Sequence, residues 1–218
     1  MEIIWHGHSF FEITGKTEEG KVNIAIDPYD ESIGIIPPQK VEADILLVSH
    51  QHPDHSNIKI IKGDYFLIDS PGEYEVKGVF IKGIPSFHDN EQGKKRGANI
   101  IFLIEFEKMK ICHLGDLGET QIFPEVMEEI FGADVLFIPV GGNFTISGKE
   151  AAKLVSQIEP KIAIPMHYKI PGLKLDLEDE KAFLRTLGIK EKEKEKRLKI
   201  TKEKLKSEGT EIVLLSPR

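Results

Sequence analysis

Short apolar runs separated by polar turn residues recur along the first half of the chain. They are rich in Ile, Val and Phe, and Gly, Pro, Asp or Asn bounds them. The six runs cover residues 2–13, 21–27, 44–50, 64–69, 79–84 and 99–106. β-branched and aromatic residues in bounded runs are typical of strands. Gly72 and Gly78 punctuate the stretch around the fifth run, which predicts a hairpin there.

The second half alternates between strand and helix patterns. Strands are predicted over residues 108–116, 133–142, 161–168 and 210–217, and helices over 123–132, 147–160 and 177–188. The helix over 147–160 begins with Ser147 and Glu150 in capping-box spacing and stops at Pro160. This alternation predicts an α/β protein with strands enough for two sheets. The 218 residues contain no linker-like segment, so we expect a single domain, 1–218.

The composition indicates a folded globular protein, because 40% of the residues are hydrophobic and 30% are charged. The net charge of −7 disfavours nonspecific electrostatic binding of nucleic acid. No apolar run approaches the roughly 20 residues of a membrane span. A single cysteine, Cys112, and the lack of a signal-peptide pattern favour a cytoplasmic location. The mixed charges of residues 190–206 predict a solvated surface connection.

Candidate chemistry lies at the ends of three of the predicted strands. The runs "DILLVSH", "KICHLGD" and "KIAIPMH" end in His50, Asp116 and His167. Functional loops gather at the carboxyl ends of strands in open α/β sheets. Because imidazole and carboxylate are metal ligands, three such ends predict one convergent metal centre.

The loop "SHQHPDH" supplies more ligands than one metal needs. It contains His50, His52, Asp54 and His55, whereas a catalytic zinc takes three protein ligands and a water. Two ions account for the surplus, with His50 and His52 facing one ion and Asp54 and His55 facing its neighbour. The alternative is a polar surface loop that happens to be rich in histidine.

These motifs also carry a resemblance to a known family. "SHQHPDH" matches the H-x-H-x-D-H signature of the metallo-β-lactamase superfamily. The start "WHGHSFFEI" resembles the opening of its L-ascorbate-6-phosphate lactonase-like (UlaG-like) branch, and so do "IDPY", "SFHD", "HLGDLG", "PVGGNFT" and "PKIAIPMHY" in the same order. The resemblance covers most of residues 1–172.

The resemblance implies a four-layer αβ/βα sandwich of two mixed sheets flanked by helices, with a dinuclear metal site at one edge. Carried over position by position, the first ion would be held by His50, His52 and His88, the second by Asp54, His55 and His167, and Asp116 would bridge both. The expected cofactors are two divalent ions, zinc first, with manganese or iron as alternatives.

Five further residues are assigned less directly than the candidate ligands. The resemblance places His8 near the site, in contact with substrate or a metal-bound water, and a structural histidine at a strand end is its alternative. The resemblance also implies that Asp27 braces the histidine loop, and the alternative is that Asp27 only forms an Asp-Pro turn with Pro28. His6 is treated as incidental, His113 as a residue that supports the ligands or packs, and Cys112 as a buried small hydrophobe.

The implied activity is hydrolysis by a hydroxide shared between two ions, which requires no Ser or Cys triad. Asp54 is the candidate to orient the hydroxide or shuttle a proton, with His8 as an alternative donor. The resemblance suggests a small lactone or related ester as substrate. Two weak signals for anion binding are present. The helix start "TISGKE" could bind a phosphate, although Ser147 is more simply its N-cap. The loop "GKKRG" could attract an anion, although three exposed cations in a loop are usually only solvated.

Two other functions stay open at this point. The same pair of ions would also cleave a small or cyclic phosphodiester. A diiron redox module or a non-catalytic metal-binding protein is the alternative of another class, although one cysteine excludes an in-chain Cys₄ cluster. The expected partner is a small-molecule substrate, with no nucleic acid, no membrane and a homo-oligomer as the assembly suggested by the resemblance.

Overall fold

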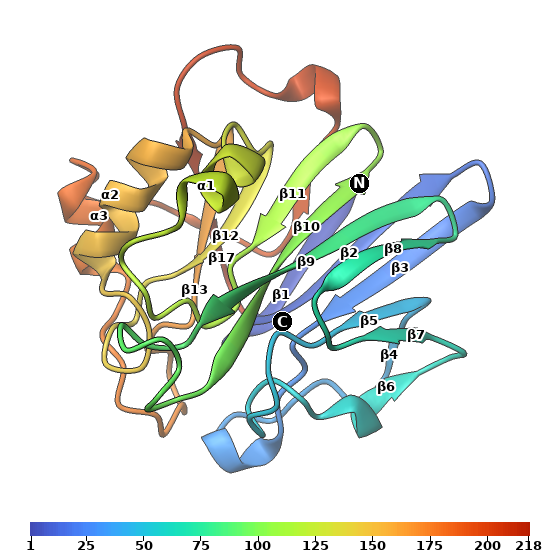
Figure 1. Cartoon of the computed structure of the whole chain (residues 1–218), viewed down its shortest axis with the longest axis horizontal. Helices are drawn as coiled ribbons and strands as arrows, with labels where there is room; N and C mark the ends of the chain where they lie inside the picture. Colours follow the sequence, from blue (N-terminus) through green and yellow to red (C-terminus); the bar gives the residue numbers. More distant parts are fainter.

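The fold is built on two mixed β-sheets (Figure 1). The computed structural model describes residues 1–218. The first sheet has six strands in the order β15 (Leu198–Lys199), β1 (Glu2–Gly7), β2 (Phe10–Thr17), β3 (Gly20–Ile26), β5 (Ile45–Leu47) and β7 (Phe66–Ile68). Its strands are antiparallel from β15 to β3, whereas β3, β5 and β7 are parallel.

The second sheet has seven strands and is also mixed. Its order is β16 (Glu211–Ile212), β13 (Ile162–Met166), β12 (Val135–Pro139), β11 (Met109–His113), β10 (Ala98–Phe106), β9 (Val79–Phe87) and β8 (Gly72–Val76). β16 to β11 are parallel, and β11 to β8 are antiparallel. Two small ladders pair β4 (Val41–Glu42) with β6 (Ile61–Lys62) and β14 (Lys194–Glu195) with β17 (Leu214–Leu215).

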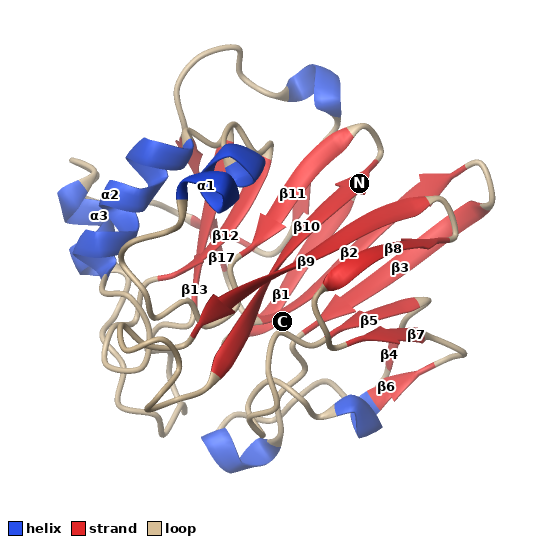
Figure 2. Ribbon diagram, in the orientation of Figure 1, coloured by secondary structure: helices blue, strands red, loops and turns tan.

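The α-helices are few and lie on one side of the molecule. α1 (Pro124–Ile130), α2 (Gly148–Ile158) and α3 (Lys181–Thr186) all follow β11 in the chain, and they gather on the side formed by β11–β13 (Figure 2). The only helices between β3 and β7 are the 3-10 helices η1 (Glu31–Ile33) and η2 (Ile58–Ile60), and η3 (Lys202–Lys204) lies near the C-terminus. This arrangement confirms the predicted fold class. None of these helices is both long and apolar enough to cross a membrane.

The central parallel strands are apolar on both faces because both faces are covered. All residues of β5, β12 and β13 are buried, which is the pattern expected of strands in the interior of a parallel sheet. Side chains from the two sheets share one core: the ring of Phe11 on β2 lies 4.2 Å from that of Phe137 on β12, measured between centroids. The core therefore joins the two sheets and holds their strand ends in fixed relative positions.

The prediction of one strand over residues 2–13 is wrong. The chain turns between β1 and β2, so that Ile3 pairs with Ile13. His8 lies in this turn with φ of +53°, a left-handed conformation that β-branched residues avoid. Its carbonyl accepts hydrogen bonds from the Trp5 indole at 2.9 Å and from the backbone N–H of His167 at 3.0 Å. The turn was hidden in the sequence because no Pro, Asn-Gly or Asp-Gly marks it.

The C-terminal segments differ from prediction in a second way. The charged stretch 190–206 is mostly exposed, as predicted, although Ile200 is buried, and it is more than a connection because it supplies β14 and β15. β15 pairs with β1 at the edge of the six-stranded sheet, where Lys199 and the preceding Arg197 suit an edge strand. The predicted strand over 210–217 is split between β16 and β17, which pair in two different sheets.

Candidate metal centre

The candidate site lies where strand ends from the two sheets meet. His50 follows β5 of the six-stranded sheet, and His88, Asp116 and His167 follow β9, β11 and β13 of the seven-stranded sheet. The strand ends named by the sequence pattern therefore converge, but they converge from opposite sheets. All four side chains are buried.

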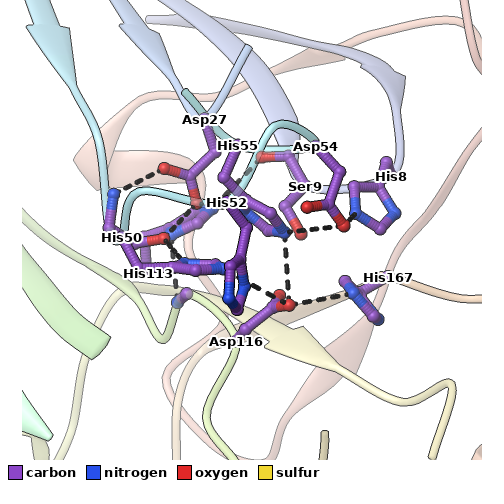
Figure 3. Close-up of polar contacts among 12 residues, drawn as sticks. His8, Ser9, Asp27, His50, His52, Asp54, His55, His113, Asp116 and His167 are labelled. Carbon is purple, nitrogen blue, oxygen red and sulfur yellow. Dashed lines mark hydrogen bonds and ion pairs between the residues drawn. The ribbon is translucent and has the colours of Figure 1, made fainter. Parts of the chain in front are cut away.

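Asp116 is at the centre of this cluster (Figure 3). Its Oδ2 lies 3.0 Å from His167 Nε2, 3.2 Å from both His55 Nε2 and His88 Nε2, and 3.9 Å from His50 Nε2. Burial by itself would raise the pKa of Asp116, but the imidazoles of His167 and His55 hold it well below its usual value. The carboxylate is thus ionised at neutral pH and surrounded by four imidazoles.

The ligand atoms fall into three overlapping groups, in each of which all atoms lie within 4.8 Å of one another. The groups are His50, His52 and His88; His50, His55 and Asp116; and His8, Asp54, His55 and His167. Two clusters joined by Asp116 and shared histidines are what a pair of neighbouring ions requires. Sequence reasoning placed every one of these residues in or beside the site.

Several nitrogen and oxygen atoms in the cluster that could bind a metal have no hydrogen-bond partner. His50 Nε2, His55 Nε2 and Asp116 Oδ1 are buried and unpaired, although leaving a buried polar atom unpaired is costly. Imidazole nitrogens and carboxylate oxygens are the donors that Zn, Mn and Fe accept. The residues present therefore fit one or more divalent ions, which would satisfy these atoms.

Asp27 holds the histidine loop from behind. Its Oδ1 accepts the Ser49 N–H at 2.7 Å, and its Oδ2 accepts the Ser49 hydroxyl at 2.6 Å and lies 3.0 Å from His55 Nδ1. Burial by itself would raise the pKa of Asp27, but His55 and other imidazoles lower this pKa by more, so the net shift is downward. The brace that the resemblance implies is therefore present.

This network fixes the tautomers of two histidines. Because Asp27 is an ionised acceptor, His55 must donate from Nδ1, so that Nε2 is the nitrogen that would bind an ion. The Ser49 hydroxyl donates to Asp27 and lies 2.9 Å from His50 Nδ1, so it accepts from that nitrogen. Both imidazoles therefore turn Nε2 toward the cluster. Sequence reasoning missed Ser49, whose only signal is its position just before His50.

Asn99 holds Asp116 from the opposite side and was also missed. Its side-chain oxygen accepts the Asp116 N–H at 2.9 Å, and its Nδ2 donates to Leu114 O at 2.9 Å and Ser86 Oγ at 2.7 Å. Asn99 lies on β10, outside the motifs that supply the candidate ligands, so no sequence signal distinguishes it from an ordinary strand residue.

His8 lies inside the cluster and contacts Asp54. Its Nε2 is 3.1 Å from Asp54 Oδ2, and its ring centroid is 4.2 Å from that of His167. Burial, and after it the charge of His167, lower the pKa of His8 to about 4, so its ring is neutral at pH 7. Neutral His8 donates to Asp54, whose pKa burial would raise but His8 and His55 hold well below its usual value.

The remaining residues in question lie outside the cluster. His6 Nε2 is 3.2 Å from Glu12 Oε2. His113 accepts the Gly115 N–H at Nδ1 and lies 3.4 Å from Ser9 O at Nε2. Cys112 is fully buried on β11, and burial raises the pKa of its thiol to about 12. Each of these contacts agrees with a supporting or packing role.

A cavity of about 300 Å³ opens beside the cluster. The site residues that line it are His52, Asp54, His88, Asp116 and His167. Lys95 and Arg96 of the "GKKRG" loop, together with Phe144 and Leu175, complete the lining. The volume suits a small molecule, and its polar groups all belong to the cluster or to the two cations.

Comparison with known proteins identifies relatives of this architecture. The domain family described as the beta-lactamase superfamily domain matches residues 2–167. A metal-dependent hydrolase of Thermococcus onnurineus is 33% identical over 214 residues, which cover 84% of this chain and 92% of that protein. The crystal structure of a Thermotoga maritima protein, described as a Zn-dependent hydrolase of the metallo-β-lactamase superfamily, is similar with a TM-score of 0.77 and 38% identity, covering 99% of each chain.

A more distant structure shares the fold alone. A metallo hydrolase of the archaeon Ignicoccus hospitalis superposes with a TM-score of 0.66 at 18% identity, covering 99% of this chain and 95% of that one. The two-sheet arrangement is thus retained at low sequence identity.

Proposed function

This chain is a metal-dependent hydrolase that belongs to the metallo-β-lactamase superfamily, and we propose that it hydrolyses a small lactone or a related ester with two divalent ions. The observation that carries the proposal is the set of four imidazoles around the buried Asp116 carboxylate beside a small cavity. The choice of a lactone rests on the motifs shared with the L-ascorbate-6-phosphate lactonase-like branch. Zinc is the proposed metal, with manganese and iron as alternatives.

The proposed ligand sets follow the geometric groups. His50, His52 and His88 would hold the first ion, and Asp116 would lie between both ions. Asp54, His55 and His167 would hold the second ion. When bound, such a pair supplies hydroxide near neutral pH and polarises the oxygen of the bond to be cleaved.

The chain's own residues prepare this chemistry by fixing protons. Asp27 and Ser49 each keep a proton on Nδ1 of His55 and His50, so that Nε2 is the nitrogen of each ring that faces an ion. Asn99 fixes the backbone at Asp116. These contacts hold the site in its binding geometry before any ion arrives, which lowers the cost of binding.

Asp54 is the proposed proton carrier of the reaction. It is ionised, lines the cavity and is held by the Nε2–H of His8. An ionised carboxylate can accept a proton and return it to the leaving alkoxide. His8, with a pKa of about 4, is neutral at pH 7 and its Nε2–H is directed at Asp54, so its proposed role is to orient that carboxylate. This assignment favours Asp54 over His8 as the proton donor to the leaving group.

The test is a hydrolase screen on protein reconstituted with Zn, Mn or Fe. The panel contains γ-lactones, thioesters and bis-p-nitrophenyl phosphate, and the His50→Ala variant is the control. We expect turnover of at least one lactone or ester by the wild type and its loss in the variant. Equal rates for the two proteins on every substrate would contradict the proposal.

The same panel discriminates the other functions. Preferential turnover of bis-p-nitrophenyl phosphate would favour phosphodiester hydrolysis. Two iron atoms per chain with oxygen reactivity, in protein analysed as isolated and without hydrolysis of any substrate, would favour a redox module.

A further inference from the structure

The cavity beside the cluster contains a cation without an acidic partner. Lys95 and Arg96 both belong to the loop between β9 and β10 and line the cavity. The Lys95 ammonium pairs with the Glu91 carboxylate. Arg96 makes no ion pair, since its side chain donates only to a backbone carbonyl. Its positive charge is therefore available to a ligand in the cavity.

Three contacts hold Arg96 in place. Its backbone N–H donates to Asp89 Oδ2 at 2.8 Å, and its Nη2 donates to Asn143 O at 3.0 Å. The guanidinium carbon also lies 5.4 Å from the centroid of the Phe144 ring. A guanidinium has five N–H donors, so most remain free after the one bond to Asn143. Because the group is already oriented, it loses little freedom when it binds a ligand.

Asp89 gives the whole loop its shape. Its carboxylate accepts four backbone N–H groups, from Glu91, Gly93, Lys95 and Arg96, at 2.7 to 3.0 Å. His88, a proposed ligand, immediately precedes Asp89. The position of Arg96 is therefore coupled through one short, well-bonded loop to the proposed metal ligands.

We propose that Arg96 binds an anionic group, a carboxylate or a phosphate monoester, on the substrate of this hydrolase. The inference rests on the proposed function and adds a substrate class to it. The planar guanidinium matches the paired oxygens of either anion. Phe144 and Leu175 provide apolar surface in the same cavity for the carbon skeleton between the anion and the bond that is cleaved. Arg96 is thus a specificity-determining residue.

The test compares charged and neutral versions of one lactone. The probes are γ-butyrolactone bearing a ring carboxylate, its primary amide, and the phosphate monoester of the ring hydroxymethyl compound. With metal-reconstituted wild type, we expect kcat/KM for at least one anion to exceed that for the amide by about tenfold or more. Arg96→Gln should bring this ratio close to one, mainly by raising KM for the anion.

Two variants separate recognition from general charge and from misfolding. Arg96→Lys keeps the charge but loses the planar fork, so it should retain only part of the preference. Lys94→Gln removes a neighbouring exposed cation that does not line the cavity, and it should keep the full preference. Thermal unfolding of each variant, compared with the wild type, shows whether the fold is intact.

Calorimetric binding of the same probes distinguishes failure of this inference from failure of the proposed function. If no lactone is hydrolysed but an anion binds more tightly than the amide, and Arg96→Gln abolishes the difference, the assignment of Arg96 stands and lactone hydrolysis fails. The larger effect between carboxylate and phosphate identifies the anion. Equal affinity for charged and neutral probes, absence of binding by both, or the same preference in wild type and Arg96→Gln overturns the inference.

Discussion

At the scale of single residues, the site depends on side chains that never touch the cavity. Asp27 and Ser49 are buried behind the histidine loop and decide which nitrogen of His50 and His55 carries the proton. A histidine with the wrong tautomer would turn an N–H, not a lone pair, toward an ion. The ability of His50 and His55 to bind an ion therefore depends on their hydrogen bonds to Ser49 and Asp27.

Replacing Asp27 by Asn tests this support. The amide cannot accept from His55 Nδ1 with the strength of a carboxylate, so Nε2 is no longer fixed as the nitrogen that faces an ion. We expect metal affinity to fall about 10- to 100-fold, measured by competition with a chromophoric chelator. Asp69→Asn is the matched control, because Asp69 is exposed and accepts from Gln51 of the same loop. Equal affinities for the two variants would contradict the tautomer argument.

Replacing Asp116 by Ala tests the shared carboxylate. Four imidazoles approach its Oδ2, so its loss removes the negative charge common to both ligand groups. We expect the bound metal, measured by elemental analysis, to fall by at least one ion per chain and hydrolysis to drop by about 100-fold or more. Wild-type metal content together with wild-type turnover would rule out the bridging role.

At the scale of secondary-structure elements, turns and caps decide where each side chain points. The periodicity of the sequence predicts the central strands and α2, because their apolar runs are long and clearly bounded. The same periodicity hides the turn at His8 and the short strands β14 and β15, since a two-residue strand has no period to detect. The carbonyl of His8 gains its partners from Trp5 and His167, which only the folded chain brings together.

The start of α2 provides a test between two roles for Ser147. Ser147 and Glu150 form a full capping box, in which the Ser147 hydroxyl accepts from the Glu150 N–H and Glu150 Oε2 accepts the Ser147 N–H at 2.7 Å. We expect Ser147→Ala to lower the free energy of unfolding by about 1 kcal/mol, measured in urea, without changing kcat or KM. Ser156→Ala within the same helix is the control and should cost little. A selective rise in KM for a phosphorylated substrate would instead indicate an anion site.

At the scale of the whole molecule, one core aligns two sheets so that their strand ends meet. β5 delivers the histidine loop from one sheet, and β9, β11 and β13 deliver His88, Asp116 and His167 from the other. Contacts such as that between Phe11 and Phe137 lie across the sheet interface. Any loss of this packing separates the two halves of the ligand set.

Cys112 provides a test of how completely that core is buried. Burial raises the pKa of its thiol to about 12, above the ordinary value of 9.0. The folded state therefore keeps the thiol proton over a range of pH in which the unfolded chain loses it. The contribution of Cys112 to the free energy of unfolding is complete below pH 9 and falls by about 1.4 kcal/mol per pH unit as the pH rises toward 12. We expect native protein to resist iodoacetamide at pH 8 and to react once unfolded. Unfolding free energies between pH 9 and 11 should fall less steeply in Cys112→Ala; parallel curves would contradict the burial argument.

The sequence alone determined the α/β class, the central strands, the capped helix α2 and the candidate ligands. Each of these rests on local information: apolar period, capping residues, or a dense motif such as "SHQHPDH". The tertiary structure alone decided that the strand ends meet from opposite sheets, that Ser49 and Asn99 support the ligands, and that Arg96 faces the same cavity as Asp116. Such contacts join residues far apart in the chain, and packing of the common core, not any local preference, brings them together.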